Sequence, residues 1–138
     1  MASTINMQDM RHLNLFEKVS KVRTRYCFSY NETLMFAVPK PMISKALGKS
    51  NENLRKLSDI VKKRIRVVAT PRGIEDAKDF ISAIIAPVQF KDIEITMDEI
   101  IVTAGPQSKA ALLGRNKRRL AEMQKIVSEF FKVGYRVI

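Results

Sequence analysis

The chain has 138 residues, of which 46% are hydrophobic and 28% are charged. This composition supports a packed core and excludes global disorder, and the length fits one ordinary domain or two very small ones. The longest apolar stretches are too short to span a membrane. The first ten residues lack the basic-then-apolar layout of a secretory signal, so we expect a cytoplasmic protein.

The counts of cysteine and histidine restrict the chemistry that is open to the chain. With Cys27 as its single cysteine, the chain can form neither an internal disulfide nor a zinc site made of cysteines. One histidine, His12, argues against most metal and triad chemistry. We expect His12 to lie in a helix without a ligand or nucleophile nearby, and Cys27 to lack the histidine that would activate it. No metal and no cofactor are predicted.

Net charge is the most informative bulk property, because the chain carries +11 with a pI near 10.0. Residues 1–70 hold 14 basic and five acidic side chains, residues 71–108 hold three and seven, and residues 109–138 hold eight and two. Two basic zones therefore flank an acidic one. This distribution favours a polyanionic partner, with nucleic acid first, over a charged surface that serves solubility alone.

Hydrophobic periodicity predicts six elements in the first half of the chain. They are a helix over 7–22, strands over 26–30 and 34–38, a short helix that ends at Gly48, a second helix after that turn, and a strand over 64–69. The second helix is predicted to bury Leu54, Leu57, Ile60 and Val61. Alternation places Leu34, Phe36 and Val38 on one face of the second strand.

The same order of elements recurs after the turn signals at residues 70–73. The second set is a helix over 74–86, a strand that starts at Val88 and runs to Ile95, a strand over 100–102, a short helix over 106–113, a long helix, and a final strand over 134–138. Adding 66 to the positions of Gly48 and of the buried stripe gives Gly114, Leu120, Met123, Ile126 and Val127, and only the final strand slips, by four residues. We interpret this correspondence as an internal duplication of an α-β-β-α-α-β unit.

Each copy places a glycine turn between two helices. The turn is Gly48-Lys49-Ser50-Asn51 in the first copy and Gly114-Arg115-Asn116-Lys117 in the second. The N–H groups at the start of the following helix favour anions, and phosphate is a natural ligand there. The alternative is that both glycines only cap the preceding helix. A basic residue after the glycine in both copies favours the phosphate-binding interpretation.

The unit order and its helix pair around "GKSN" or "GRNK" resemble the KH domain of the type II arrangement. The phrases "SKALGKSNENLRKLSDIVKKRIRVVA" and "IIAPVQFKDIEI" are similar to the archaeal NusA-like transcription termination and elongation factors. The resemblance implies an α/β (α+β) chain of two tandem KH type II domains, residues 1–70 and 71–138. In each domain, helices would pack on a three-stranded mixed sheet. It also implies binding of single-stranded RNA, which in this family is the nascent transcript, in transcription termination alongside RNA polymerase.

In KH domains a GXXG loop clamps the backbone of about four unpaired nucleotides. Both loops of this chain lack the second glycine and carry Asn51 and Lys117 in its place. Asn tolerates left-handed backbone angles better than Lys does, so the departure puts close approach of RNA in doubt chiefly in the second copy.

The residues that we expect to contact RNA are Lys45, Gly48, Lys49, Ser50, Asn51 and Arg55 in the first copy and Gly114, Arg115, Asn116, Lys117 and Arg118 in the second. Two alternatives remain open: a protein-docking module on RNA polymerase or the ribosome, and a binder of single-stranded DNA. We expect no enzyme activity, no small-molecule substrate and no membrane partner.

Three aromatic residues, Tyr26, Phe28 and Tyr30, share one face of the first strand and could form a base-stacking platform. Packing of this face against the helices is the prediction that we favour, with Tyr30 as the most exposed of the three.

Overall fold

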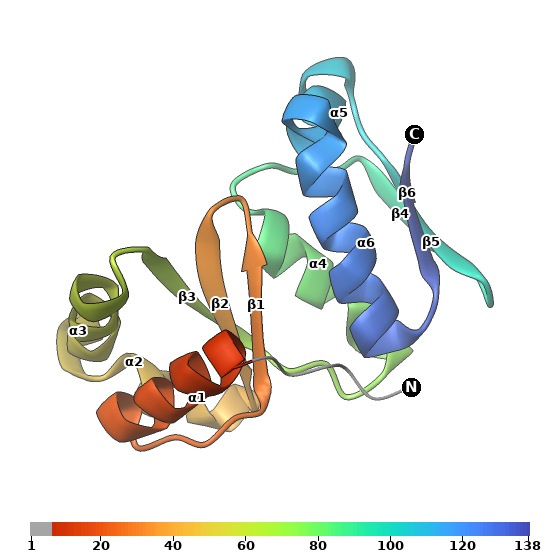
Figure 1. Cartoon of the computed structure of the whole chain (residues 1–138). Helices are drawn as coiled ribbons and strands as arrows, with labels where there is room; N and C mark the ends of the chain where they lie inside the picture. The colour runs from red at the N-terminus through yellow and green to blue at the C-terminus, as the bar shows by residue number, and fades with distance from the viewer. Residues whose placement is uncertain (1–6) are drawn as a thin grey trace. The chain divides into compact units, whose positions relative to one another are not determined.

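The structure, a computed structural model, describes residues 7–138. Residues 1–6 lie outside the described part; they include the start of the predicted first domain and part of the segment in which no secretory signal was expected. The described chain forms two compact units, and the boundary between them falls between Thr70 and Pro71 (Figure 1). Within the described residues, each unit holds three α-helices and one three-stranded sheet. None of these helices combines the length and apolar character needed to cross a bilayer.

The first unit follows the predicted order of elements. They are α1 (Met7–Ser20), β1 (Tyr26–Tyr30), β2 (Thr33–Val38), α2 (Ile43–Leu47), α3 (Glu52–Val61) and β3 (Arg64–Ala69). Strand β2 is central, antiparallel to β1 and parallel to β3. A parallel pair needs a crossover connection, and the helices α2 and α3 provide it.

The core of the first unit forms where the helices meet the central strand. Leu34, Phe36 and Val38 share one face of β2, as predicted, and lie in a buried cluster with Phe16 of α1 and Leu57 of α3. The rings of Phe16 and Phe36 stack with centroids 4.3 Å apart. Stacking of this kind adds to the burial of two large apolar side chains, so it fixes α1 on the sheet.

The prediction that Ile60 is buried with the rest of the apolar stripe on α3 is wrong. Ile60 is 57% exposed, whereas Leu57 is fully buried. Ile60 belongs to the last turn of α3, which ends at Val61, while the equivalent Ile126 lies inside a longer helix and is buried. The end of a short helix has fewer neighbours to cover it.

The second unit repeats the same topology. Its elements are α4 (Ala77–Ile85), β4 (Asp92–Ile95), β5 (Glu99–Thr103), α5 (Pro106–Leu113), α6 (Arg118–Phe131) and β6 (Gly134–Val137). Strand β5 is central, antiparallel to β4 and parallel to β6. Phe80 of α4 packs against Phe130 and Phe131, so α4 contacts the C-terminal end of α6.

The strand predicted to start at Val88 starts later. The Val88 N–H donates to the Ile85 carbonyl at 3.0 Å, so the chain is still turning there, and the first hydrogen bond to β5 comes from the Lys91 N–H to the Thr103 carbonyl. Pro87 has no N–H to offer a ladder. The apolar residues Val88 and Phe90 therefore belong to a connecting segment rather than to β4.

The four-residue slip in the repeat has a simple structural origin. Helix α3 has 10 residues and helix α6 has 14. The glycine turns before these helices keep the 66-residue spacing, and the left-handed residues that end them, Lys62 and Lys132, are 70 apart. The extra helical turn shifts β6 without changing the order of the sheet.

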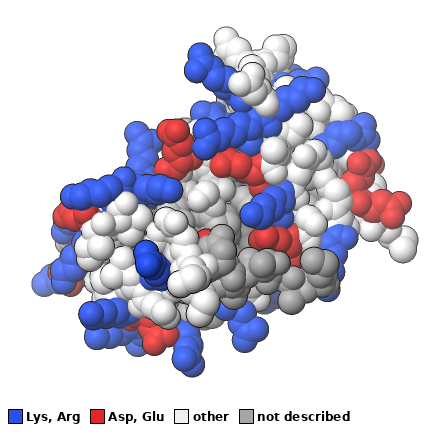
Figure 2. Space-filling view, in the orientation of Figure 1, with Lys and Arg blue, Asp and Glu red and all other residues white. Residues whose placement is uncertain are grey.

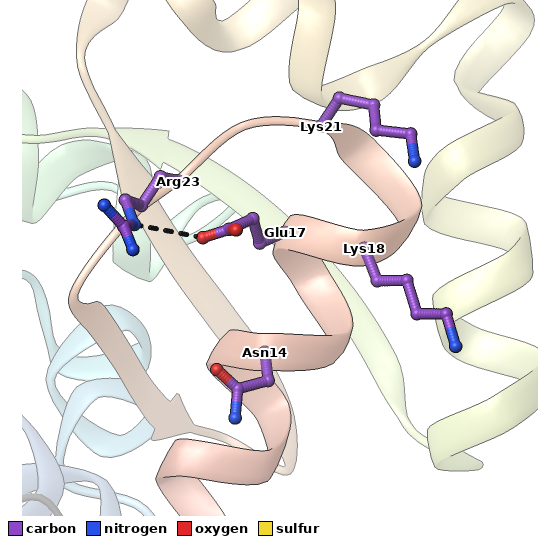
Figure 3. A pocket seen from close by; sticks show the side chains of 5 residues that line it. All are labelled: Asn14, Glu17, Lys18, Lys21 and Arg23. Atoms are coloured by element: carbon purple, nitrogen blue, oxygen red, sulfur yellow. Dashed lines mark hydrogen bonds and ion pairs between the residues drawn. The ribbon is translucent and has the colours of Figure 1, made fainter.

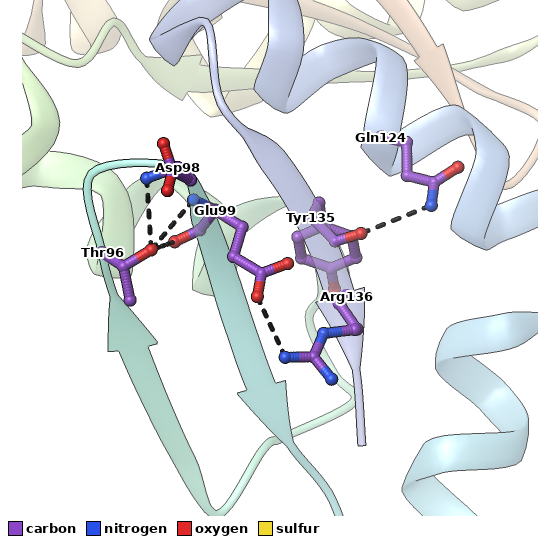
Figure 4. Close-up of polar contacts among 6 residues, drawn as sticks. All are labelled: Thr96, Asp98, Glu99, Gln124, Tyr135 and Arg136. Carbon is purple, nitrogen blue, oxygen red and sulfur yellow. Dashed lines mark hydrogen bonds and ion pairs between the residues drawn. The ribbon is translucent and has the colours of Figure 1, made fainter.

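The β4–β5 hairpin carries much of the acidic zone. Its turn is held by the Thr96 hydroxyl, which accepts hydrogen bonds from the N–H groups of Asp98 and Glu99 and donates to the Glu99 carbonyl (Figure 4). The Glu99 carboxylate pairs with Arg136 of β6 at 2.9 Å. Acidic side chains gather at the right of the space-filling view, while elsewhere on that face Lys and Arg are scattered among uncharged and a few acidic side chains (Figure 2).

Candidate functional site

The two glycine turns have the same backbone geometry. Gly48 has φ 77° and ψ 177°, and Gly114 has φ 72° and ψ 175°. Each glycine N–H donates to the carbonyl four residues earlier, Ser44 or Ala110, and so ends the preceding helix. A positive φ with extended ψ is a conformation that glycine alone adopts readily. Both glycines therefore cap a helix and redirect the chain.

Two left-handed residues follow in each turn. They are Ser50 and Asn51 in the first unit and Asn116 and Lys117 in the second, with φ between 53° and 59°. The N–H groups of Asn51 and Lys117 donate back to the carbonyls of the turn glycines at 3.2 and 3.1 Å. The residues that replace the second glycine thus adopt a left-handed backbone in both turns, and Lys117 does so as fully as Asn51.

A buried side chain fixes the first turn. Asn53 of α3 is 8% exposed, and its amide donates to the carbonyls of Ala46 at 3.1 Å and Lys45 at 3.4 Å. It thereby satisfies carbonyls at the end of α2 that lack helical partners. A Cβ at Gly48 would lie 2.8 Å from the Asn53 amide nitrogen, so glycine is needed for space as well as for φ.

Arg119 has the same role in the second turn. Its guanidinium donates to the Ala111 carbonyl at 2.9 Å, and Ala111 and Arg119 are 66 residues after Lys45 and Asn53. A Cβ at Gly114 would meet Arg119 Cγ at 2.8 Å and the Arg119 backbone nitrogen at 3.1 Å. Asn53 and Arg119 were not among the predicted site residues, although the 66-residue register aligns them.

The predicted contact side chains are all exposed. They are Lys45, Lys49, Ser50, Asn51, Arg55, Arg115, Asn116, Lys117 and Arg118. Arg23–Glu17, Arg72–Asp76 and Arg136–Glu99 form ion pairs among the described residues, and none of these three pairs involves a cation of the turns. Within each unit the turn therefore presents its cations to solvent, beside the N-terminus of α3 or α6.

The aromatic face of β1 differs from the prediction. Tyr30 is only 5% exposed and Phe28 9%, while Tyr26 is the most exposed at 36%. Cys27 packs against the helical core cluster, so by alternation Tyr26 and Phe28 point to the opposite face of the sheet. The burial of Phe28 and Tyr30 agrees with the favoured prediction of packing rather than base stacking, whereas packing against the helices and the predicted order of exposure are wrong.

A second basic feature lies at the C-terminal end of α1. A surface pocket there is lined by Asn14, Glu17, Lys18, Lys21 and Arg23 (Figure 3). The Arg23 guanidinium is 3.1 Å from the Glu17 carboxylate. Glu17 therefore offsets one of the three positive charges that line the pocket. This pocket was not predicted from the sequence.

The prediction that His12 has no possible ligand or nucleophile nearby is wrong. One side-chain ligand atom of each lies within 4.8 Å of the other and of the Asp9 carboxylate. Burial, with Asp9 beside it, raises the pKa of the Cys27 thiol to about 12. Burial and the charge of Lys63 lower the pKa of His12 below its ordinary value. A protonated thiol is a poor nucleophile, so this pair does not resemble an activated Cys–His site.

The chain is similar to three archaeal proteins named "Probable transcription termination protein NusA". It is 29% identical to the Methanococcus vannielii protein over 80% of this chain and 64% of that one. For the Thermoplasma acidophilum protein the identity is 22%, over 94% and 91%, and for the Methanocaldococcus jannaschii protein 23%, over 94% and 71%. The chain thus spans less than two thirds of the Methanococcus vannielii protein.

No family model matches the chain. A solved structure described as "Crystal structure of APE1850" superimposes with a TM-score of 0.68 at 20% sequence identity, over 97% of this chain and 99% of that one. This likeness supports the mixed α/β fold with two three-stranded sheets. The predicted resemblance to archaeal NusA-like proteins is confirmed by the three archaeal relatives.

Proposed function

We propose that the chain is a non-enzymatic, single-stranded RNA-binding protein made of two KH-like domains of the type II arrangement, residues 1–70 and 71–138. The α-β-β-α-α-β order and the central strand of each mixed sheet support this assignment. RNA would contact the glycine turn of each unit, at the eleven positions predicted from the sequence.

The observation that carries the proposal is the duplicated turn. Two segments 66 residues apart share positive-φ glycines, paired left-handed residues and a side chain that locks the turn to the end of the preceding helix. A glycine without a side chain lets an RNA backbone approach closely, and the helix that follows directs N–H groups toward a phosphate. Lys49, Arg115 and Lys117 would neutralise the phosphates.

The relatives' names supply the biological setting. Proteins named as transcription termination factors suggest that the RNA is a nascent transcript and that RNA polymerase is a partner. We therefore propose a role in transcription termination or antitermination, in the cytoplasm.

The left-handed backbone at Asn51 and Lys117 bears on the docking alternative. The protein-docking alternative was favoured by the absence of a second glycine from each loop, which suggested loops that no longer bind RNA. Both residues in its place, Asn51 and Lys117, adopt the left-handed backbone that a glycine would supply. Single-stranded DNA differs from RNA chiefly by the 2′-hydroxyl, so it serves as the comparison ligand.

Fluorescence anisotropy with a labelled, unstructured RNA and with its DNA equivalent tests the proposal. The variants are Lys49→Asp and Arg115→Asp. The control is Lys78→Asp, which makes the same change in charge on α4, the helix that packs at the end of α6 away from the turn. We expect each turn variant to weaken RNA binding at least several-fold and the control to change it much less.

Salt dependence provides a second criterion in the same experiment. For single strands, the logarithm of the binding constant falls by about 0.7 for each phosphate contact per tenfold increase in salt. Each turn variant should make this slope shallower by about that amount. The proposal is wrong if folded turn variants keep the affinity and salt slope of the Lys78→Asp control.

A further inference from the structure

The contact between α1 and β1 in the first unit brings together three side chains that can ligate a metal. Asp9 and His12 lie three residues apart on α1, and therefore on one face of the helix, and Cys27 lies on β1. One carboxylate oxygen, one ring nitrogen and the thiol sulfur all lie within 4.8 Å of one another, and all three residues are partly buried. Oxygen, nitrogen and sulfur donors converge here from two elements.

The histidine has an unused donor or acceptor atom. His12 Nδ1 is buried and has no hydrogen-bond partner among the described residues. Leaving a buried polar atom unpaired costs about 1–3 kcal/mol, and metal ligation is one way to use such a nitrogen.

We infer that Asp9, His12 and Cys27 form a Zn²⁺ site, with a water molecule as the fourth ligand. Imidazole, thiolate and carboxylate are the ligands that zinc takes in proteins, usually in tetrahedral geometry. Ligand atoms around a tetrahedral zinc ion lie roughly 3.3–3.8 Å apart for metal–ligand bonds of about 2.0–2.3 Å, so the three groups need to close by about 1 Å.

The charges of the ligands match a divalent cation, although the nearby cation Lys63 opposes one. A thiolate and a carboxylate together balance the charge of Zn²⁺. A thiol must lose its proton to ligate zinc, so binding should release a proton and weaken as pH falls. The bound ion would join α1 to β1.

Cobalt substitution tests the site in the full chain. Chelator-treated protein is titrated with Co²⁺, whose thiolate complexes give a charge-transfer band in the near ultraviolet, and Zn²⁺ is then added to displace it. We expect one Co²⁺ per chain, an intense band, and loss of the band on addition of Zn²⁺. Cys27→Ser should abolish the band, and Asp9→Asn or His12→Gln should weaken metal affinity at least tenfold.

Asp59→Asn, which removes an exposed carboxylate on α3, is the matched control and should bind Co²⁺ like the wild type. Circular dichroism establishes that each variant is folded, and His12→Gln decides the matter if Cys27→Ser does not fold. Either of two results overturns the inference: no charge-transfer band in folded wild-type protein, or a band that Asp9→Asn and His12→Gln leave unchanged.

Discussion

At the scale of single residues, each turn depends on a glycine and on one side chain that bonds the end of the preceding helix. Gly48 and Gly114 have positive φ, and an added Cβ would press on Asn53 or Arg119. The need for glycine was predictable from the sequence. The identity of the locking side chains was not, because a short amide in one unit and a long guanidinium in the other reach equivalent carbonyls by different paths.

Gly114→Ala should destabilise the second unit by about 1–3 kcal/mol, because it combines an unfavourable φ with a contact of 2.8 Å. Gly134→Ala is the matched control in the same unit, since its new Cβ would find only ordinary contacts at 3.6 Å or beyond. We expect the control to change the free energy of unfolding by about 0.5 kcal/mol or less. Urea unfolding followed by circular dichroism measures both, and equal effects would contradict the strain argument.

His12 gives a pH dependence with a defined sign. Its pKa in the folded chain is lowered by burial and by Lys63, while Asp9 acts in the opposite direction. The unfolded state therefore binds protons more readily, and stability is lost as pH falls through the pKa of the folded state. Metal-free wild type should lose more thermal stability between about pH 7 and pH 5 than His12→Gln. An equal or larger loss in the variant would refute this.

At the scale of elements, the order and type of every helix and strand followed from periodicity and from turn residues. Strand β3 and helix α5 have the predicted bounds, and in α5 the turn residues Gly105 and Gly114 flank both ends. The errors occur where tertiary contacts decide the outcome. Val88 and Phe90 are apolar but lie in a connecting segment, and Tyr30 is buried on a sheet face that periodicity could not assign to the interior or to solvent.

Phe16 tests how strongly α1 depends on its contact with the sheet. Phe16→Ala removes a fully buried ring that stacks on Phe36, so we expect a loss of about 3–5 kcal/mol in the stability of the first unit. Met10→Ala on the same helix is the control, because Met10 is 53% exposed and should matter by about 0.5 kcal/mol or less. Similar unfolding midpoints for the two variants in urea would show that α1 is not anchored through this ring.

At the scale of the whole molecule, the charge pattern and the 66-residue repeat were visible in the sequence. The Asp9–His12–Cys27 cluster was not, because its members come from two elements and only the packing of α1 on the sheet brings them together. The pocket at Glu17 and Arg23 is different, because its lining residues all lie between Asn14 and Arg23 and its basic residues could have been read from the sequence. Local patterns predict elements, whereas clusters formed by tertiary contacts need the fold.

Two turns on one chain should make affinity depend on RNA length. An RNA of about five nucleotides can occupy one turn, while one of about 20 nucleotides can reach both and gains from linkage. Wild type should therefore bind the longer RNA at least tenfold more tightly, and Lys49→Asp or Arg115→Asp should remove most of that gain. Anisotropy titrations with both RNAs measure the ratio. A gain that survives both substitutions would mean that the second contact lies elsewhere.

The most direct test of the central claim, that RNA phosphates bind at both glycine turns, is a titration of ¹⁵N-labelled protein with single-stranded RNA followed by amide chemical shifts. We expect the largest shifts at Gly48–Asn51 and at Gly114–Lys117, with saturation at both. Shifts confined to the pocket of Lys18, Lys21 and Arg23, or to the acidic β4–β5 hairpin, would contradict it.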